Sequence, residues 1–406
     1  MSSSVYETRL ETLLGRQREL VGRPNEVDES WTNGVFERFR HPVLTAEHTP
    51  LAWRYDLDPE TNPWLLERLG INAVFNAGAI EQDGKILLVC RVEGVDRESF
   101  FAIAESSSGI DGFRFWDYPI LLPETWDPDV NVYDMRLTRH EDGFVYGLFC
   151  TERKDPASPP GDSSSAIAQC GIVRTRDLVS WERLPDLVSD SPQQRNVVLH
   201  PEFIDGQYGL YTRPQDGFIE AGQGGGIAWA LCETMERPVI HAERIVDPKT
   251  YHTVKEVKNG QGAPPIKTRA GWLHIAHGVR NTAAGLRYVL YAFLTALEHP
   301  DQVTRRPGGY LLAPEGAERV GDVSNVVFSN GAVARQNGEL LLYYGSSDTR
   351  VHVVRSTLER MVDYVLHTPE DPLRSRACVE QRTALIRKNL ELIRSRRGHP
   401  LLYELD

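Results

Sequence analysis

The stretch Asn131–Leu137 contains a single carboxylate, Asp134, between Tyr133 and Arg136, at the expected start of a short apolar strand. A carboxylic acid held at a fixed place can give a proton to a leaving group during catalysis. An Asp at the entrance to a strand is also common as a turn or solvated residue, because Asp favours such positions. We predict that Asp134 is a catalytic acid, on the strength of the residues that accompany it elsewhere in the chain.

Basic and polar side chains recur at similar places in the other strand-forming parts of the chain. They are Asn76, Arg91, Arg195, Asn196, His200, Arg213, Lys267, His277, Arg280, Ser346, Ser347 and Asp348. Arg presents a planar fork of donors and Lys a mobile point charge, so several of them together bind phosphate or carboxylate. Any one of them alone is more commonly part of a surface ion pair. Gathered near Asp134, they would form a local anion site in a protein whose net charge is −12.

Aromatic residues accompany this set and could stack on sugar rings, although Tyr and Trp in strands more often belong to the core. They are Tyr133, Tyr211, Tyr288, Tyr291 and Trp229. Hydrolysis of a glycoside by the usual scheme needs two carboxyl groups. Phosphorolysis needs only the acid, because inorganic phosphate brings its own nucleophilic oxygen and must be held by cations. One carboxylate among many cations therefore favours phosphorolysis.

The elements that must gather these residues repeat along the chain, roughly every 60 residues. Turn dipeptides that end in glycine lead into β-favouring residues, which is typical of hairpins. The turn glycines are Gly84, Gly143, Gly206, Gly271 and Gly338. The strands expected before these turns are residues 76–80, 133–138, 197–204, 264–268 and 328–334. At least one more strand follows each turn, so the sequence predicts an all-β fold, a five-bladed β-propeller with N- and C-terminal helices. An array of unrelated hairpins in a sandwich is the alternative.

The two ends of the chain are expected to lie outside the propeller. An apolar stripe near the N-terminus predicts a helix that Gly22-Arg23-Pro24 ends, and residues 374–396 show a second helical pattern. The predicted organisation is an N-terminal helical extension at 1–30, the propeller at 31–365 and a C-terminal helical extension at 366–406. Because the propeller offers little to cover these apolar stripes, we expect a homo-oligomer formed through the terminal helices.

Composition and charge limit the possible functions. The chain has 406 residues, of which 41% are hydrophobic and 25% charged, as expected for a globular protein with a large core. The negative net charge argues against nucleic acid binding, which needs clustered Lys and Arg. The five cysteines include no C-x-x-C pair, so we expect buried thiols rather than disulfides or a metal site. Without a secretion signal or a long apolar run, the sequence predicts a cytoplasmic protein with no membrane segment.

Six short motifs occur in a distinctive order along the chain. They are Asn76-Ala77-Gly78-Ala79, Arg91-Val92-Glu93-Gly94, Tyr133-Asp134-Met135-Arg136, Gln194-Arg195-Asn196, Gly262-Ala263-Pro264-Pro265-Ile266-Lys267 and Gly345-Ser346-Ser347-Asp348-Thr349. Their joint order and spacing resemble the inverting β-mannoside phosphorylases of glycoside hydrolase family 130. Tyr-Asp-Met-Arg stands where much of the family has Glu-Asp-Pro-Arg, and Ala77 stands where relatives often carry Ser.

The resemblance implies a propeller that converts β-1,4-mannosyl-glucose and phosphate into α-mannose 1-phosphate and glucose, reversibly and with inversion. It implies no metal or organic cofactor, since inorganic phosphate is a co-substrate. Asp134 would be the proton donor, acting through the mannose 3-hydroxyl. The residues expected at the phosphate are Arg195, Asn196, Lys267 and Tyr288 or Tyr291, with His277 and Arg280 added only by their blade positions. The residues expected at the sugar are Asn76, Arg91 and Asp348, to which the blade positions add Tyr133 and Arg213.

Three other interpretations stay open. A β-mannoside hydrolase on the same propeller would need a second carboxylate, for which Glu93, Glu152 and Asp348 are available. A mannosyl-oligosaccharide phosphorylase would differ in its acceptor, and loops at the channel mouth would decide between glucose, mannose and N-acetylglucosamine. A non-catalytic propeller that binds a glycan or a protein would have no reason to concentrate Arg and Lys in the channel.

Overall fold

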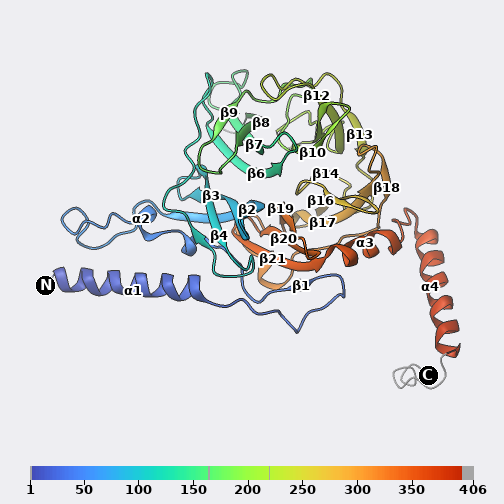
Figure 1. The fold of residues 1–406 in the computed structure, drawn as a ribbon, viewed down its shortest axis with the longest axis horizontal. Helices are drawn as coiled ribbons and strands as arrows, with labels where there is room; N and C mark the ends of the chain where they lie inside the picture. The colour runs from blue at the N-terminus through green and yellow to red at the C-terminus, as the bar shows by residue number, and fades with distance from the viewer. Residues whose placement is uncertain (1, 163–164, 219, 396–406) are drawn as a thin grey trace.

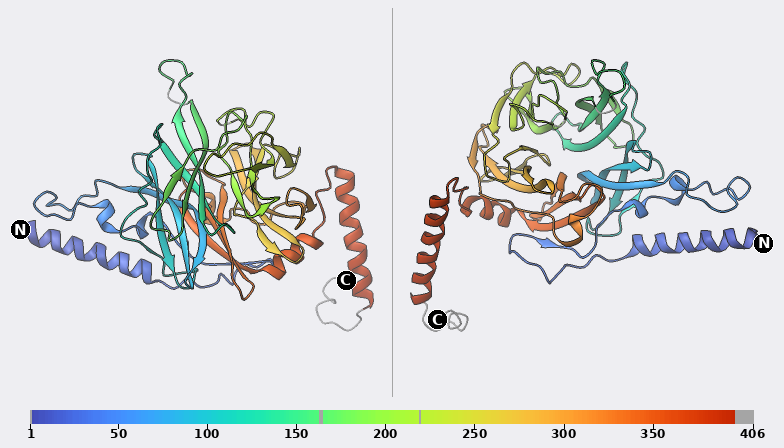
Figure 2. Two further views of the ribbon diagram at one scale, coloured as in Figure 1. Left: turned by 45° about the horizontal axis from the view of Figure 1, so that its top comes forward. Right: turned by 180° about the vertical axis from the view of Figure 1, so that it is seen from behind.

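In the computed structural model, which describes residues 2–162, 165–218 and 220–395, antiparallel strands form five sheets around a central axis (Figure 1). Four of these sheets contain four strands each, and the remaining one contains five. The view from behind shows the same ring of sheets (Figure 2). The predicted five-bladed β-propeller is confirmed.

Each of the first four blades follows the chain outward from the axis. The first contains β2 (Ile71–Gln82), β3 (Lys85–Gly94), β4 (Ser99–Ser106) and β5 (Arg114–Phe115). The second contains β6 (Asn131–Arg139), β7 (Val145–Lys154), β8 (Ala166–Thr175) and β9 (Glu182–Leu184). The third contains β10 (Val198–Ile204), β11 (Gln207–Thr212), β12 (Ile227–Cys232) and β13 (Arg244–Asp247). The fourth contains β14 (Lys258–Gln261), β15 (Ile266–Thr268), β16 (Gly271–Thr282), β17 (Gly285–Thr295) and β18 (Val303–Arg305).

The fifth blade is completed by the start of the chain, which closes the ring. It contains β19 (Val327–Ala334), β20 (Glu339–Ser346), β21 (Arg350–Thr357) and, as its outer strand, β1 (Glu37–Arg38). Arg38 of β1 is buried and donates to Glu318 at 2.6 Å and to the Ala313 carbonyl at 2.9 Å. The surrounding segment, residues 25–70, has little regular structure. It contains the short helices η1 (Ala46–His48) and α2 (Leu51–Arg54), and η2 (Gly316–Arg319) lies near Arg38.

Two-residue turns join the inner strands of the first and third blades to their neighbours. Asp83 and Gly84 link β2 to β3, and Asp205 and Gly206 link β10 to β11. All four residues have positive φ, between 51° and 79°. A turn with two positive φ values matches the twist of paired strands, and Asp followed by Gly adopts it readily. The glycine-ended dipeptides therefore make the hairpins that the sequence predicts.

The hydrophobic core lies between neighbouring blades. Side chains alternate between the two faces of a strand, so successive residues contact the preceding and the following blade. Leu148 packs toward the third blade and Phe149 toward the first. Leu210 and Tyr211 divide in the same way between the second and the fourth. Each such side chain contributes about 1.5–3 kcal/mol when buried, and this packing holds the inner strands in place around the axis.

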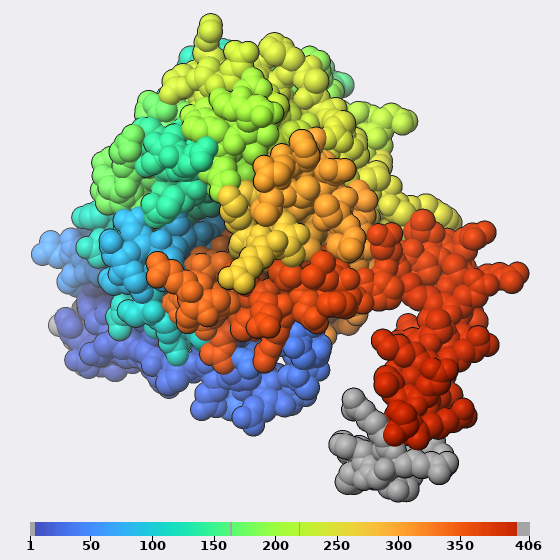
Figure 3. Space-filling model, turned by 45° about the vertical axis from the view of Figure 1, so that its right-hand side comes forward, coloured from blue at the N-terminus to red at the C-terminus, as the bar shows by residue number. Residues whose placement is uncertain are grey.

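The terminal helices contact the propeller to very different extents. α1 (Ser2–Gly22) packs Tyr6, Leu10 and Leu13 against the α2 region. α3 (Leu358–His367) buries Met361 and Val365 between the fourth and fifth blades. α4 (Ser375–Ser395) stands away from the body and buries none of its described side chains (Figure 3).

The C-terminal extension carries one correction and leaves two predictions open. Cys378 on α4 is exposed, whereas the other four cysteines are buried as free thiols. The predicted helix end at Arg396, and the rest of the extension to residue 406, lie outside the described residues. The homo-oligomer and the limits of the two extensions stay predictions.

The fourth blade differs from its predicted form. The strand expected at 264–268 is only the short β15, and a second segment, β14, lies along the other end of β16. β14 contains Lys258, Asn259, Gly260 and Gln261, none of which favours strands. Pairing with β16 therefore overrides the local preference of this segment. The predicted strand covered only β15, whereas β14 lies at the end of the blade near the cavity described below.

Candidate active site

A cavity of about 750 Å³ lies where the inner strands converge, and residues of all five blades line it. Nine residues that the sequence analysis assigns to the site are among them. They are Asn76, Arg91, Tyr133, Asp134, Arg195, Asn196, Arg213, Tyr288 and Asp348. The blade repeat thus brings together residues that are distant in sequence.

Asn76 and Asp134 occupy corresponding places on the inner strands β2 and β6. At both places the register with the next strand shifts, which marks a β-bulge. Their φ values are 47° and 62°, in the left-handed region that Asn and Asp tolerate better than most residues. A bulge re-aims its side chain, and here both side chains reach the cavity, where Asn76 Nδ2 donates to Asp134 Oδ1 at 2.9 Å.

Arg136 stabilises the backbone of the bulge at Asp134. Its side chain is fully buried, and Nη1 donates to the Asp134 carbonyl at 2.7 Å. The guanidinium lies over the ring of Phe328 at 5.5 Å. The Tyr-Asp-Met-Arg motif therefore supplies both the predicted acid and the residue that fixes the backbone of that acid.

Arg91 and Asp348 lie on one side of Asp134. Arg91 Nη1 is 3.7 Å from Asp134 Oδ1, and Arg91 Nη2 pairs with Glu93 at 2.7 Å. Burial, and then the charge of Asp134, raises the pKa of Asp348 to about 7. At neutral pH Asp348 is therefore present in both protonation states. A carboxyl group in this condition can donate a hydrogen bond to a sugar hydroxyl or accept one.

Arg195 and Arg213 lie on the other side of the cavity and contact neutral groups. Arg195 donates to the Phe218 carbonyl at 2.7 Å and to the Tyr133 hydroxyl at 3.1 Å. Arg213 Nη1 donates to His277 Nε2 at 2.9 Å. Burial, followed by the charge of Arg213, lowers the pKa of His277 well below its usual value, so the ring is neutral and can accept. Among the described residues no carboxylate pairs with either arginine within 4 Å, so their positive charge is not balanced locally.

Lys258, at the start of β14, adds a third cation that the sequence analysis missed. Burial, and then the charges of Arg213 and Arg195, lowers the pKa of Lys258 to about 7. One signal in the sequence could have indicated this segment. Gly260 leaves no room for a side chain, because a Cβ there would clash with Asn196. A glycine two residues from a lysine marks close approach of the backbone to the site.

Several buried polar atoms at the cavity have no partner within the described chain. They are Nε and Nη2 of Arg136, Nε of Arg213, and Oδ1 of Asn76 and Asn196. Leaving such an atom unsatisfied costs about 1–3 kcal/mol, so this lining is kept at a cost to stability.

Lys267 lies away from the cavity, contrary to its predicted place beside phosphate. It is exposed on β15, and its Nζ pairs with Glu202 at 2.7 Å. Lys258 lies nine positions earlier, at the other end of the split strand, and at about 3.3 Å per residue this is a separation of up to roughly 30 Å. Lys267 was predicted from the motif that ends with it and from an inner strand expected later in the chain than β14, whereas Lys258 is the lysine that lines the cavity.

His277, Arg280 and Tyr291 also do not line the cavity, and strand geometry explains why. Side chains three positions apart on a strand face opposite sides. Tyr291 therefore faces away from the side of Tyr288 and donates to Asp247 at 2.7 Å. His277 lies behind the cavity lining, where it contacts Arg213. Arg280 is three positions later on β16, so its side chain points to the opposite face of the strand.

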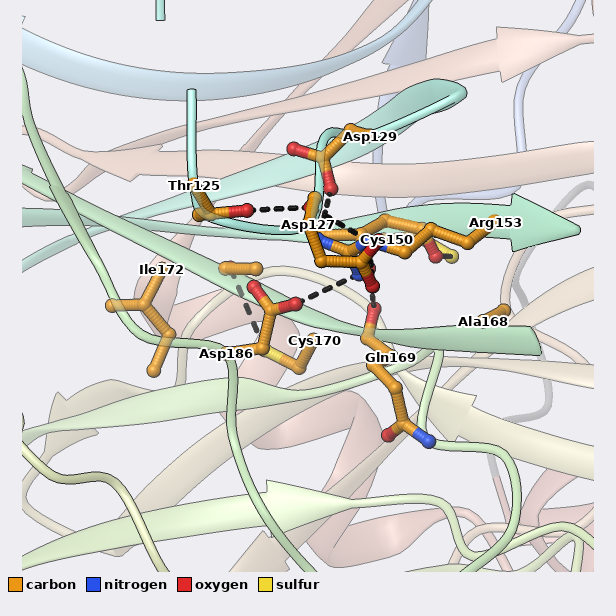
Figure 4. A network of polar contacts seen from close by, with 12 residues as sticks. Thr125, Asp127, Asp129, Cys150, Arg153, Ala168, Gln169, Cys170, Ile172 and Asp186 are labelled. Atoms are coloured by element: carbon orange, nitrogen blue, oxygen red, sulfur yellow. Dashed lines mark hydrogen bonds and ion pairs between the residues drawn. The ribbon is translucent and has the colours of Figure 1, made fainter. Parts of the chain in front are cut away.

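A second arginine cluster holds the loop that leads into β6 (Figure 4). Arg153 of β7 pairs with Asp129 at 2.7 Å and with Asp186 at 2.8 Å, and its Nε lies 3.1 Å from Asp127. Arg183 pairs with Asp186 and lies 3.6 Å from Asp129. We call these five residues the Arg153 cluster. The cluster ties the residues just before β6 to the outer strands, and so it holds the strand that carries the predicted acid.

The three residues that could supply the second carboxylate for hydrolysis, Glu93, Glu152 and Asp348, also line the cavity. Glu93 pairs with Arg91, Glu152 accepts from the Tyr133 hydroxyl at 3.0 Å, and Asp348 is described above. Position alone therefore does not separate hydrolysis from phosphorolysis. Across the described ranges, no group of three or more His, Cys, Asp or Glu is arranged to hold a metal ion. The helices within those ranges include none long and apolar enough to cross a membrane.

Comparison with known proteins connects this cavity to a family. The family model described as β-1,4-mannooligosaccharide phosphorylase matches residues 69–367. A 4-O-β-D-mannosyl-D-glucose phosphorylase of Bacteroides fragilis is 59% identical over 391 residues, which cover 96% of this chain and 100% of that protein. A β-1,4-mannooligosaccharide phosphorylase of Ruminococcus albus is 27% identical over 341 residues, 79% of this chain and 92% of that protein. The structure of a β-1,2-mannobiose phosphorylase from Listeria innocua with β-1,2-mannobiose has the same fold, with a TM-score of 0.66 at 20% identity and coverage of 82% and 99%.

Proposed function

The chain belongs to glycoside hydrolase family 130, whose matching model is described as β-1,4-mannooligosaccharide phosphorylase, and on that basis we propose that it catalyses the reversible phosphorolysis of β-1,4-mannosyl-glucose. The products are α-mannose 1-phosphate and glucose, which makes the enzyme a glycosyltransferase-type phosphorylase. Glucose as the acceptor is supported by the 59% identity to the B. fragilis protein, whose name specifies mannosyl-glucose.

One observation supports phosphorolysis above the other chemistries. On one side of the cavity Asp134 and Asp348 accompany Arg91, whereas the other side has three cations, Arg195, Arg213 and Lys258. A disaccharide bound at Asp134 would leave the cationic side for phosphate. Buried guanidinium donors without carboxylate partners are suited to a phosphate anion, because they supply charge-assisted hydrogen bonds that the protein does not use itself.

The proposed reaction is a single displacement. A phosphate oxygen attacks the anomeric carbon of mannose from the cationic side, the bond from that carbon to the glucose oxygen breaks, and Asp134 supplies the proton that this oxygen takes up, relayed by the mannose 3-hydroxyl. Attack from the face opposite the leaving group inverts the configuration. The arginines and the lysine hold phosphate in line, which is catalysis by positioning and electrostatics.

The same proposal covers the surroundings of the reaction. Phosphate is the co-substrate, and no metal or organic cofactor takes part in the proposed step. A cytoplasmic location fits a reaction that yields a charged sugar phosphate, because a membrane retains such a product. The homo-oligomer is proposed through the terminal helices, and light scattering of the full chain over a dilution series would measure it.

Incubation with mannosyl-glucose, with and without inorganic phosphate, tests the function directly. We expect mannose 1-phosphate and glucose in equal amounts, and only when phosphate is present. Nuclear magnetic resonance of the first product formed should show the α-anomer. The β-anomer, or equal rates with and without phosphate, would contradict the proposal.

The same incubation separates the other candidates. Free mannose released without phosphate would indicate a hydrolase, and glycoside hydrolases that target β-1,2-mannosidic linkages do occur within this family. A higher kcat/KM on mannosyl-oligosaccharides than on mannosyl-glucose would indicate the oligosaccharide phosphorylase. Binding of the sugar with no turnover would indicate the non-catalytic propeller.

A further inference from the structure

A second cavity, of about 650 Å³, lies on the outer side of the third blade. Glu243, on the segment that leads into β13, lines this cavity. The active-site cavity described above lies on the inner side of the same blade. Glu243 reaches inward from the outer cavity, and its contacts connect the two sides of the blade.

The contacts of Glu243 converge on one carboxylate oxygen. Gln194 Nε2 donates to Glu243 Oε1 at 2.8 Å, and the Thr212 hydroxyl donates to the same oxygen. Gln194 and Thr212 are both completely buried. The side-chain oxygen of Gln194 in turn accepts from the Arg213 backbone N–H at 3.0 Å. A single carboxylate oxygen thus bonds two buried side chains that come from different parts of the blade.

Both buried partners stand next to arginines of the active-site cavity. Gln194 directly precedes Arg195, and Thr212 directly precedes Arg213. Arg195 lies on the segment that enters β10, and Arg213 lies just after β11. The regular pairing of β10 with β11 ends at Val198 and Tyr211, and the next backbone bridge between the two segments joins Gln193 to Gln215. Arg195 and Arg213 lie in the gap between these two points. The carboxylate of Glu243 links the two segments within this gap, through Gln194 and Thr212.

We propose that Glu243 is a positioning residue that sets the spacing of Arg195 and Arg213, and through them the affinity for phosphate. This inference rests on the proposed function, since it assigns phosphate to those two arginines. Glu243 itself touches neither phosphate nor sugar. Burial raises the pKa of Glu243, which agrees with a carboxylate drawn inward by its hydrogen bonds.

Steady-state kinetics of Glu243 variants tests the proposal, with phosphate and disaccharide varied separately. Glu243→Ala removes the shared acceptor, and Glu243→Asp withdraws it by one methylene group. We expect each to raise the KM for phosphate about tenfold or more, with the KM for disaccharide changed less than twofold. Glu243→Gln keeps a side-chain oxygen in the same place, so it should restore the KM for phosphate to within about twofold of the wild type. Thermal unfolding of each variant monitors folding, and Glu243→Asp serves if Glu243→Ala does not fold.

Glu233 provides a matched control, because it is an exposed acidic residue that lines the same outer cavity. Glu233→Ala should leave both KM values unchanged. An unchanged KM for phosphate in Glu243→Asp would overturn the proposal, as would equal rises of the two KM values or a Glu243→Gln variant as impaired as Glu243→Asp. Absence of phosphate-dependent turnover in the wild type would instead refute the proposed function, so the two failures are distinguishable.

Discussion

The second blade contributes to two arginine clusters that differ in how their charge is balanced. In the Arg153 cluster, one guanidinium contacts three carboxylates, those of Asp127, Asp129 and Asp186. At the active-site cavity, which the adjacent residue Glu152 lines, three arginines have no carboxylate partner within 4 Å among the described residues. They are Arg136, Arg195 and Arg213. Carboxylates of the protein balance the arginine charge in the Arg153 cluster, whereas no carboxylate pairs with the three arginines at the cavity.

This difference shows which cluster works on a ligand. A buried ion pair adds little net stability but costs several kcal/mol when one partner is removed, so the Arg153 cluster fixes a loop. Buried cations without carboxylate partners are kept at a cost to stability, and a protein keeps them where an anion completes the arrangement. The count of arginines is therefore less informative than the balance of charge around each one.

The sharpest contrast comes from removing one carboxylate at the active-site cavity and one from the Arg153 cluster. Asp134→Asn keeps the left-handed backbone, because Asn tolerates it as well as Asp, but it removes the proton. We expect kcat to fall about 10³-fold, within the range of general acid catalysis. Measurement of mannose 1-phosphate formation at saturating substrate checks this. The matched variant Asp129→Asn should lower the unfolding midpoint and keep kcat within about twofold.

Rates near the wild-type value in Asp134→Asn would refute the assignment of this residue as the acid. A loss of kcat in Asp129→Asn as large as that in Asp134→Asn would show that the two clusters do not have separate roles. Circular dichroism of both variants establishes that the fold is retained.

The second prediction concerns the charge of Lys258. Its pKa of about 7 means that it is protonated below neutral pH and loses its charge above. We expect Lys258→Met to lower kcat/KM for phosphate about 10²-fold at pH 6, where the wild-type lysine is charged. The wild type should also lose kcat/KM for phosphate as the pH rises from 6 to 9.

Lys258→Arg is the matched variant for this pH dependence. Arginine stays protonated over the whole range, so the ratio of Lys258→Arg to wild type should increase with pH. The titration of phosphate itself cancels in that ratio. A constant ratio between pH 6 and 9 would contradict a role for the ionisation of Lys258. As a control, Lys267→Met should have the same pH dependence of kcat/KM for phosphate as the wild type, because Lys267 lies outside the cavity.

The sequence could predict the site wherever local pattern and blade position agreed. Asp83-Gly84 and the equivalent turns revealed the repeat, and the repeat then placed Asn76, Asp134 and Asp348 at one cavity. The β-bulges at Asn76 and Asp134 were not predictable, since a register shift depends on pairing with the next strand.

The fourth blade shows where local pattern failed. Lys258 lies in a polar, glycine-containing segment that forms a strand only because β16 pairs with it. The tyrosine was left open between Tyr288 and Tyr291, and the alternation of side chains along β17 decides for Tyr288 at the cavity. Whether such a residue reaches the cavity depends on the face of the strand it occupies and on the end of the strand it lies near. The amino-acid composition of the segment does not give either.

Breaking the Arg153 cluster is the third test of the comparison. Arg153→Met leaves three carboxylates without their common partner, so we expect a loss of about 3 kcal/mol in the free energy of unfolding. Because the loop before β6 loosens, kcat should fall only a fewfold, and the KM for phosphate should not change. Denaturant unfolding and steady-state kinetics measure the two effects. An unchanged free energy of unfolding in Arg153→Met would show that the Arg153 cluster does not stabilise the fold.

The smallest effect is expected for the stability of Asp348→Asn. Its change in unfolding free energy should have the opposite sign to that of a variant in the Arg153 cluster. Burial and the charge of Asp134 raise the folded-state pKa of Asp348 to about 7, above the value of about 3.9 in an unfolded chain. The folded protein therefore binds the proton more tightly, and the stability gained from it is lost as the pH rises from about 4 through 7. Asp348→Asn removes this loss, so its unfolding free energy relative to the wild type should increase by roughly 2 kcal/mol from pH 5 to pH 8.

Asp186→Asn supplies the opposite case for the same measurement. It removes a partner of Arg153 and Arg183, so it should be less stable than the wild type at pH 8, where Asp348→Asn should have gained. Chemical denaturation of the three proteins at pH 5 and pH 8 gives the comparison. If Asp348→Asn showed no gain between the two pH values, Asp348 would not be the buried, destabilised carboxylate of the cavity. A carboxylate whose neutralisation stabilises the fold belongs to a site arranged for a ligand, whereas one whose neutralisation destabilises it belongs to the framework.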